Sequence, residues 1–168
     1  MVTLRPFTEA ELGYFDDLPG YDDDPYSFYG FRPGTSAHLR GPWAENQFLS
    51  DSNGMLAVVV DGEVIGDVQF RALPYGPPPM SNALNIGIRV LPAYQGNGHG
   101  TAAQAALVEY LFATYPVHRI DAHTDITNRA EQRSLEKAGF TREGVVRGAQ
   151  WRDGRYNDMV VYSRLRTD

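Results

Sequence analysis

Apolar and polar residues alternate along much of this chain, as they do in strands that bury one face. The clearest case is segment 82–90, where every second residue from Leu84 to Val90 is apolar. Asp-Gly pairs at positions 61–62 and 153–154 each separate two β-rich runs and predict tight hairpins. The predicted strands are residues 2–5, 55–60, 63–70, 82–90, 119–124, 143–152 and 155–164.

Two other segments carry apolar residues at helical spacing. In residues 101–113 four such residues would share one face of a helix, which should pack on the sheet. A second helix over residues 128–138 should end at Gly139. The stretch after the first strand has no clean period and is predicted as helix and loop, and the proline-rich segment 74–79 as loop. The four residues on the first helical face are Ala103, Leu107, Tyr110 and Leu111.

Length and composition restrict the classes of protein that remain. A chain of 168 residues without repeats or linkers suits one domain, and strands joined by two crossover helices predict one mixed α/β sheet. With 21 acidic and 15 basic side chains, the net charge of −6 disfavours nucleic acid as a partner. The absence of cysteine excludes disulfides, thiolate metal sites and cysteine nucleophiles, and we predict no metal. No segment reaches the length of a membrane span, and the first nine residues do not resemble a signal peptide, so we expect a cytoplasmic protein.

The segment between the strand at 82–90 and the helix at 101–113 has glycines at alternate positions, Gly96, Gly98 and Gly100. Alternate glycines let successive backbone N–H groups turn toward one point. The start of the helix behind them adds unpaired N–H donors and a partial positive charge. We therefore predict an anion cradle here, suited to a pyrophosphate.

Several families use such a cradle, so its ligand has to be chosen among phosphate compounds. The nucleoside-triphosphate loop is excluded because no Gly-Lys-Ser/Thr sequence follows the glycines. The dinucleotide fingerprint fits in its relaxed form from Gly98 through Gly100 to Ala103. Its context disfavours it, because that fingerprint opens a series of parallel βα units, whereas one helix and a closing hairpin follow here. A glycine-rich turn that binds nothing is the remaining alternative.

Residues 95–100, Gln-Gly-Asn-Gly-His-Gly, resemble the Gln/Arg-x-x-Gly-x-Gly/Ala signature with which GNAT acetyltransferases hold the pyrophosphate of coenzyme A. Asn128 begins a helix similar to the family's asparagine-led helix that ends in Gly-Phe. Residues 143–158 resemble the closing hairpin of the branch that includes the ribosomal-protein alanine N-acetyltransferases. The resemblance covers about residues 2–165 and is strongest from Leu84 onward.

This resemblance implies a single α/β domain over residues 1–168, with a mixed, mostly antiparallel sheet of six to seven strands flanked by helices. It also implies that the central strands splay, and that the pantetheine arm of acetyl-CoA or another acyl-CoA lies in the gap. Backbone N–H groups there could also form an oxyanion site. The residues implied to bind the cofactor are Ile88, Arg89, Val90, Gln95, Gly96, Asn97, Gly98, His99, Gly100, Thr101, Asn128 and Arg133.

Transfer to an amine also needs a proton acceptor and a donor for the leaving thiolate. The tyrosine and serine hydroxyls that many relatives carry on the second helix are absent here. Glu131, three residues after Asn128, is expected to form a capping box, or else to be a proton carrier with a raised pKa. Relatives often have Glu where Asn85 stands, so the candidate bases are Asp67 and His123, acting through water.

The acceptor is expected near the N-terminal segment, where aspartates stand beside aromatic residues. Such a cluster suits a cationic amine, although three consecutive aspartates are at least as readily a solvated loop. A small-molecule amine and a protein N-terminus both fit this segment. The residues expected to bind the acceptor are Asp22, Asp23, Tyr26, Phe28, Asn85 and Trp151, and for Trp151 sheet packing is the favoured role.

The sequence therefore predicts an N-acyltransferase that moves an acyl group, by default acetyl, from acyl-CoA to an amine. The alternative is an acyl-CoA-binding sensor or interaction module with the same fold, to which the missing donor and base residues give some weight. We expect neither nucleic acid nor a membrane as partner, and a homodimer is compatible with the sequence.

Overall fold

The computed structural model describes residues 1–18, 28, 34–77 and 80–168. Within these residues one sheet has seven strands in the order β1-β2-β3-β4-β5-β7-β6. Only β4 and β5 pair in parallel, so the predicted mixed, mostly antiparallel sheet is confirmed. The strands are β1 (Val2–Arg5), β2 (Asn53–Val60), β3 (Glu63–Pro74), β4 (Asn82–Val90), β5 (Arg119–Asp125), β6 (Thr141–Arg152) and β7 (Arg155–Leu165).

Both predicted hairpins are confirmed, and their turns explain the Asp-Gly pairs. Asp61 and Gly62 join β2 to β3 with φ of 50° and 87°, and Asp153 and Gly154 join β6 to β7 with φ of 55° and 71°. Two successive residues with positive φ give a turn whose twist matches that of the strands. The loop prediction at 74–79 is one residue too early, because β3 includes Pro74.

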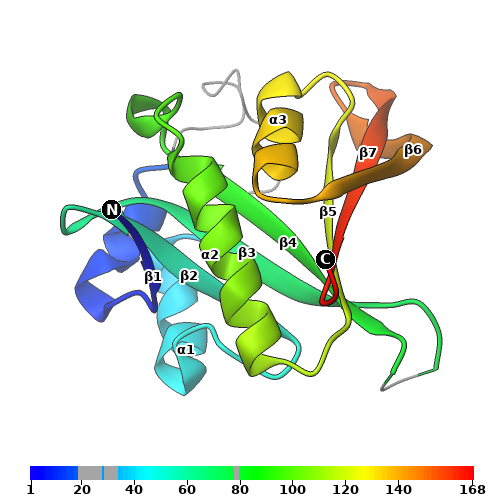
Figure 1. The fold of residues 1–168 in the computed structure, drawn as a ribbon. Coiled ribbons are helices and arrows are strands. Elements are labelled where there is room, and N and C mark those ends of the chain that lie inside the picture. Colours follow the sequence, from blue (N-terminus) through cyan, green and yellow to red (C-terminus); the bar gives the residue numbers. More distant parts are fainter. Residues whose placement is uncertain (19–27, 29–33, 78–79) are drawn as a thin grey trace.

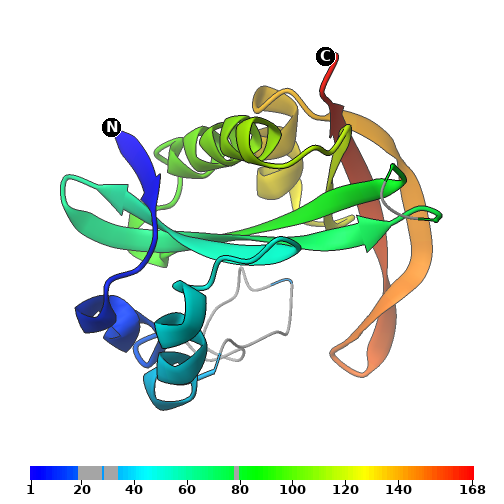
Figure 2. The same ribbon diagram turned by 90° about the horizontal axis from the view of Figure 1, so that it is seen from below.

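Helices cover both faces of the sheet, as the two views in Figures 1 and 2 make clear. The two predicted helices lie together on one face, and two further helical segments lie on the other. No helix in the described part of the chain is long and apolar enough to cross a bilayer. The helical segments are α2 (His99–Thr114) and α3 (Arg129–Lys137) on the first face, η1 (Glu9–Phe15) and α1 (Ser36–Asn46) on the second, and the short turn η2 (Pro92–Tyr94) before α2.

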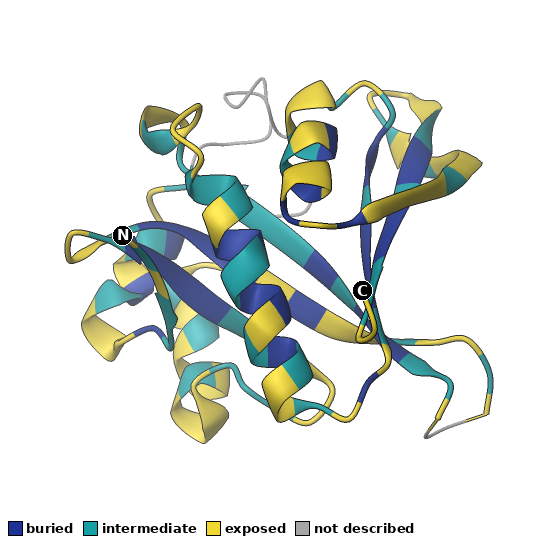
Figure 3. Ribbon diagram, in the orientation of Figure 1, coloured by how far each residue is buried: buried dark blue, intermediate teal, exposed yellow. Residues whose placement is uncertain are grey.

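The main core lies between α2, α3 and the sheet. Ala103, Leu107 and Leu111 are fully buried on the face of α2 that was predicted to pack on the sheet, whereas Tyr110 is half-buried. Figure 3 shows this buried stripe along α2. Burial of each leucine contributes about 2 kcal/mol relative to an exposed side chain. The same face also buries Gln104, a polar residue that the apolar pattern did not indicate.

A second, smaller core lies under η1 and α1 on the opposite face. Phe7, Leu12 and Phe15 pack there against β2. Trp43 of α1 packs against this cluster, and its Nε1 donates a hydrogen bond to the carbonyl of Phe7 at 2.7 Å. Helix α1 contains Pro42 and no fully buried residue, so its attachment depends on these few contacts.

The central strands splay as predicted. β4 and β5 pair only from Leu84 opposite Ile120 to Ile86 opposite Ala122. Beyond these residues β4 continues to Val90 and β5 to Asp125 without pairing with each other. The backbone of β4 after Ile86 therefore has hydrogen-bonding groups on its β5 side that no described strand uses.

Candidate functional site

A groove of about 1440 Å³ begins at the splay and extends in two directions. One end reaches the glycine-rich turn before α2, and the other passes below α1 and the start of β2. The groove is lined by β4 from Asn85 to Val90, by the first turns of α2 and α3, and by the irregular part of β6.

The glycine-rich turn has the geometry of an anion cradle. Gly96 and Gly98 have φ of 77° and 80°, and a Cβ added to either would meet nothing within 4 Å. Gly98 is also the N-cap of α2, whose first intrahelical hydrogen bond runs from Ala102 N to Gly98 O at 3.1 Å. The backbone N–H groups of the three residues between them have no acceptor within the helix. The residues thus fit a diphosphate, held by main-chain donors at the positive end of α2.

Two side chains brace this turn. Gln95 donates from Nε2 to the carbonyl of Val90 at 2.8 Å, which fastens the turn to the end of β4. Asn97 donates from Nδ2 to the carbonyl of Gln95 at 3.1 Å. Asn97 is the one predicted cofactor residue that does not line the groove, so a contact from its side chain has no support.

Helix α3 adds positive charge beside the cradle. Arg133 and Lys137 both line the groove and are exposed. Residues four apart lie on the same helical face, one turn from each other. Arg133 was among the predicted residues, whereas Lys137 was missed, although this spacing could have indicated it.

A chain of polar side chains joins α2 to α3 next to the cradle. Gln104 donates from Nε2 to Oε1 of Glu131, and Ser134 donates from Oγ to Oε1 of Gln104 at 2.9 Å. Because the Ser134 proton is used in this way, the hydroxyl of Thr101, 3.1 Å from Ser134 Oγ, must donate to it. Thr101 can therefore offer a ligand only its backbone N–H as a donor.

Asn128 caps α3, but Glu131 does not complete a capping box. Oδ1 of Asn128 accepts a hydrogen bond from the backbone N of Glu131 at 3.2 Å, as predicted. The carboxyl group of Glu131 faces Gln104 and lines the groove, so the expectation that this side chain is a cap is wrong. Burial raises its pKa to about 7, since the single hydrogen bond from Gln104 only partly offsets desolvation. The geometry of Glu131 thus fits the alternative expectation, that its carboxyl group carries a proton near neutral pH.

Asp67 lies below the groove and does not line it. Its side chain is fully buried, and this burial raises its pKa. Its oxygens accept hydrogen bonds from Tyr14 Oη at 2.9 Å and Gln69 Nε2 at 2.7 Å, and Nη1 of Arg89 is 3.9 Å away. The structure buries Asp67, in contrast to the solvent exposure expected for a polar strand residue. Its action as a base through water stays a prediction, and the residue also fits a role in holding Tyr14 and Arg89.

His123 lies in the groove at the splay itself. It follows Ala122, the last residue of β5 that pairs with β4, and its side chain is half-buried. Burial lowers its pKa, with smaller effects from nearby Asp121, which raises it, and from Arg71 and Arg119, which lower it. The imidazole is consequently neutral at pH 7 and can accept a proton.

Asn85 also lines the groove, next to two residues that the sequence interpretation missed. Its Nδ2 donates to the carbonyl of Asp121 at 3.4 Å, which leaves Oδ1 as an acceptor. Gln69 and Arg71 on β3 line the same region, with Arg71 opposite Asn85 in the sheet. The signal was available in the polar alternation of β3 at positions 67, 69 and 71.

Phe28 is in contact with Arg152 of the same chain. Nη1 of Arg152 donates to its carbonyl oxygen, and the Arg152 guanidinium carbon lies 5.5 Å from the ring centroid. The same guanidinium forms a buried ion pair with Asp125 at 2.6 Å. The aromatic face predicted to receive a cationic acceptor thus receives Arg152, and the acceptor-binding role of Phe28 is not supported.

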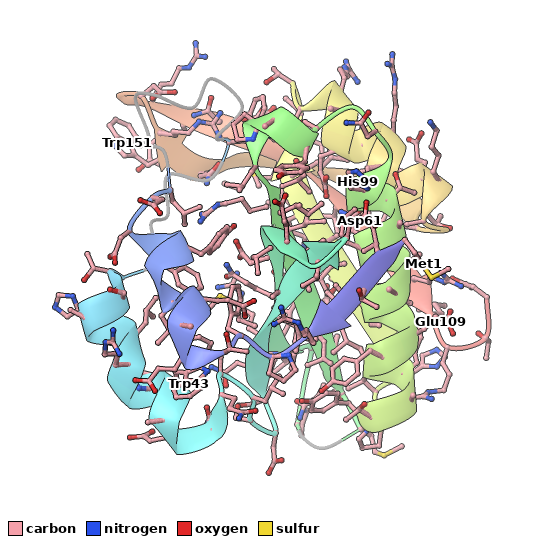
Figure 4. The ribbon with its side chains drawn as sticks, turned by 90° about the vertical axis from the view of Figure 1, so that its left-hand side faces the viewer. Met1, Trp43, Asp61, His99, Glu109 and Trp151 are labelled. Carbon is pink, nitrogen blue, oxygen red and sulfur yellow. The ribbon has the colours of Figure 1, made fainter. Side chains whose placement is uncertain are left out.

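Trp151 lies on β6 outside the groove lining, on the hairpin edge labelled in Figure 4. It is 63% exposed and stacks edge-on with Tyr156 at 4.9 Å between ring centroids. The favoured packing role therefore fits, as a contact between the two arms of the hairpin, and the acceptor-binding role does not. The remaining predicted acceptor residues, Asp22, Asp23 and Tyr26, lie outside the described residues.

Comparison with known proteins agrees with this geometry. The family model of the GNAT acetyltransferase domain matches residues 2–141. The Bacillus subtilis N-acetyltransferase YoaA is 33% identical over 101 residues, which are 60% of this chain and 55% of YoaA. The ribosomal-protein-serine acetyltransferase of Escherichia coli is 22% identical over 66% of this chain and 60% of its own length. This chain thus spans little more than half the length of these two relatives.

A solved structure extends the likeness to nearly the whole chain. The aminoglycoside acetyltransferase AAC(6')-Ib, determined in complex with coenzyme A, has a TM-score of 0.74 and 26% identity over 99% of this chain and 96% of its own. The glycine cradle, the splayed β4 and β5 and the family match together support acyl-CoA as the cosubstrate. The chain belongs to the GNAT family of acetyltransferases.

Proposed function

We propose that this protein, in the cytoplasm, transfers an acyl group, by default acetyl, from acyl-CoA to an amine that attacks the thioester directly. The proposal depends on one observation, the continuity of the groove from the glycine cradle to the free side of β4. The cradle suits the diphosphate, and the backbone of Ile88, Arg89 and Val90 suits the amides of the pantetheine arm. Together they would place a thioester beside His123.

His123 is the proposed proton acceptor for the amine. It lines the groove where β4 and β5 part, and its lowered pKa keeps the imidazole neutral. Backbone N–H groups of β4 could stabilise negative charge on the thioester oxygen. With the two reactants held in one groove, proximity would supply much of the acceleration.

Glu131 is the proposed proton donor to the leaving thiolate. Its carboxyl group lines the groove from α3 and has a pKa of about 7, so a substantial fraction is protonated at neutral pH. A carboxylic acid would then replace the hydroxyl that many relatives carry on this helix. Gln104 holds it in place from α2.

The acceptor is an amine of either of two kinds. AAC(6')-Ib is named for an aminoglycoside, and the E. coli relative for a serine of ribosomal proteins. These names support an amine in general, and both a small molecule and a protein N-terminus remain candidates for this chain.

The direct test measures thiol released from acetyl-CoA by the full chain in the presence of a panel of amines. We expect release with at least one amine, and His123→Gln should lower kcat by on the order of a hundredfold. The affinity for CoA should not change, because His123 belongs neither to the glycine cradle nor to the strand proposed to hold the pantetheine arm. His118→Gln, an exposed histidine outside the groove, is the matched control. Binding of CoA without thiol release for any amine would contradict the proposal and favour an acyl-CoA-binding module.

A further inference from the structure

The acceptor end of the groove has a floor made by side chains from β3, β4 and β5. Cross-strand pairing places Gln69 beside Gly87 and Arg71 beside Asn85. These residues share the η1 side of the sheet, because Gln69 bonds to Asp67, which is in contact with Tyr14 of η1. The floor thus extends from the splay toward the edge below α1, where Arg71 lies.

Two carboxylates on the same face of the sheet as this floor, those of Asp67 and Asp121, are already compensated. Asp67 has Arg89 at 3.9 Å together with two hydrogen-bond donors. Asp121 is 2.6 Å from Arg119 and accepts a hydrogen bond from Tyr75 at 2.6 Å. Neither carboxylate lines the groove, and therefore neither offers a negative charge to a cationic substrate.

Arg71 and Glu45 differ from these carboxylates, because neither forms an ion pair with any residue that the structure describes. Arg71 is exposed and lines the groove, and among the described residues no carboxylate lies within 4 Å of its guanidinium. Glu45 of α1 lines the same end of the groove but forms no ion pair with it. The cation is close enough to lower the pKa of His123. A guanidinium with its donors available is suited to bind a carboxylate or phosphate in a bidentate manner.

Asn85 completes the recognition of such a ligand. Its Oδ1 remains an acceptor for an amine N–H, because Nδ2 bonds to the Asp121 carbonyl. Asn85 is two residues, or roughly 7 Å, along β4 from Gly87, which faces the splay. A small molecule could therefore place its amine near His123 and an acidic group near Arg71.

We propose that the acceptor is an amine that carries an anionic group, a carboxylate or a phosphate ester, and that Arg71 binds this group. This inference rests on the proposed acyl transfer and specifies its substrate class. It also predicts that simple polycations are poor substrates, because Arg71 repels a second positive charge.

The test uses pairs of amines with and without an acidic group, and rates are compared per concentration of the neutral amine, because the acidic group also changes the pKa of the amine. Glycine, β-alanine and phosphoethanolamine are compared with glycinamide, β-alaninamide and ethanolamine, and spermidine represents polycations. Thiol release from acetyl-CoA should give a kcat/KM at least about tenfold higher for the better of the acidic compounds than for its neutral partner. Comparison of the two carboxylate compounds with phosphoethanolamine identifies which acidic group is bound.

Arg71→Gln should reduce that ratio to about one through a higher KM of the acidic compound, with the affinity for CoA unchanged. Arg155→Gln, which changes an exposed arginine at the hairpin turn outside the groove, should leave the ratio intact. Equal rates for each pair, a preference for spermidine, or an unchanged ratio in Arg71→Gln would overturn this inference while leaving acyl transfer in place. If no amine released thiol, the proposed function itself would fail.

Discussion

The two ends of the groove are built in different ways. The cofactor end depends on backbone, with glycines at positive φ, the first N–H groups of α2 and the edge of β4. The acceptor end depends on side chains from three strands, among them Arg71, Asn85 and His123. A backbone site needs particular residues where φ is positive, and it therefore leaves a sequence signature. A site made of side chains can be remodelled by single substitutions, and it leaves almost none.

The largest effect should come from a substitution that fills the glycine cradle at the cofactor end. Gly98→Glu places a side chain and a negative charge in the space that a diphosphate would occupy. We expect the affinity for CoA to fall by about a thousandfold, on the order of 4 kcal/mol, as measured by calorimetry.

A matched control separates this loss from backbone strain. Gly62 in the β2–β3 turn has φ of 87°, close to the 80° of Gly98, and a Cβ there also meets nothing within 4 Å. Both substitutions should therefore lower the free energy of unfolding by about 1 to 2 kcal/mol. The affinity of Gly62→Glu for CoA should equal that of the unaltered protein. Native affinity in Gly98→Glu would show that the turn does not hold the cofactor.

A medium effect should come from Glu131, which lines the groove from α3. Its pKa is raised from 4.5 to about 7, so the folded protein binds the proton more tightly than the unfolded chain. Between these two pH values only the unfolded chain loses the proton, and each pH unit lowers the unfolding free energy by about 1.4 kcal/mol.

Glu131→Gln removes this dependence. Below pH 4.5 it should match the unaltered protein, and above pH 7 it should be more stable by about 3 kcal/mol. Urea denaturation at pH 5, 6, 7 and 8 measures the difference. Glu109→Gln, at an exposed position on α2 labelled in Figure 4, should show no such trend. A constant difference between Glu131→Gln and the unaltered protein at all four pH values would mean that the carboxyl group is not buried as described.

The same contrast explains which parts of the structure could be predicted. The strand 82–90, both Asp-Gly hairpins and the helical face of α2 were predicted because periodicity and turn residues are local properties. Helix α1 was not, because Gly41 and Pro42 interrupt any pattern and the helix depends on the distant contact from Trp43 to Phe7. Local sequence carries no information about such a contact.

The errors at the site have the same origin. Asp67 alternates on β3 like a solvated residue, but in the fold it is buried in contact with Tyr14, 53 positions earlier, and Arg89. Glu131 has the spacing of a capping box, but Gln104 on another helix draws its carboxyl group away. The charge and the exposure of a polar side chain depend on its tertiary partners, whereas a glycine with positive φ carries its own constraint.

The smallest effect should come from Tyr14→Phe, which tests whether the buried contacts of Asp67 with Tyr14 and Arg89 influence the cofactor end of the groove. The phenol donates to Asp67 at 2.9 Å, and Asp67 in turn lies 3.9 Å from Arg89 on β4. Loss of one donor to a buried carboxyl group should cost about 1 to 2 kcal/mol of unfolding free energy. The affinity for CoA should remain unchanged, because the cradle and this hydrogen bond share no residue. Tyr156→Phe, at a 70% exposed position, should change stability by less than about 0.5 kcal/mol. A drop in CoA affinity in Tyr14→Phe would mean that Asp67 and Arg89 transmit strain along β4, and that the two ends of the groove are one coupled site.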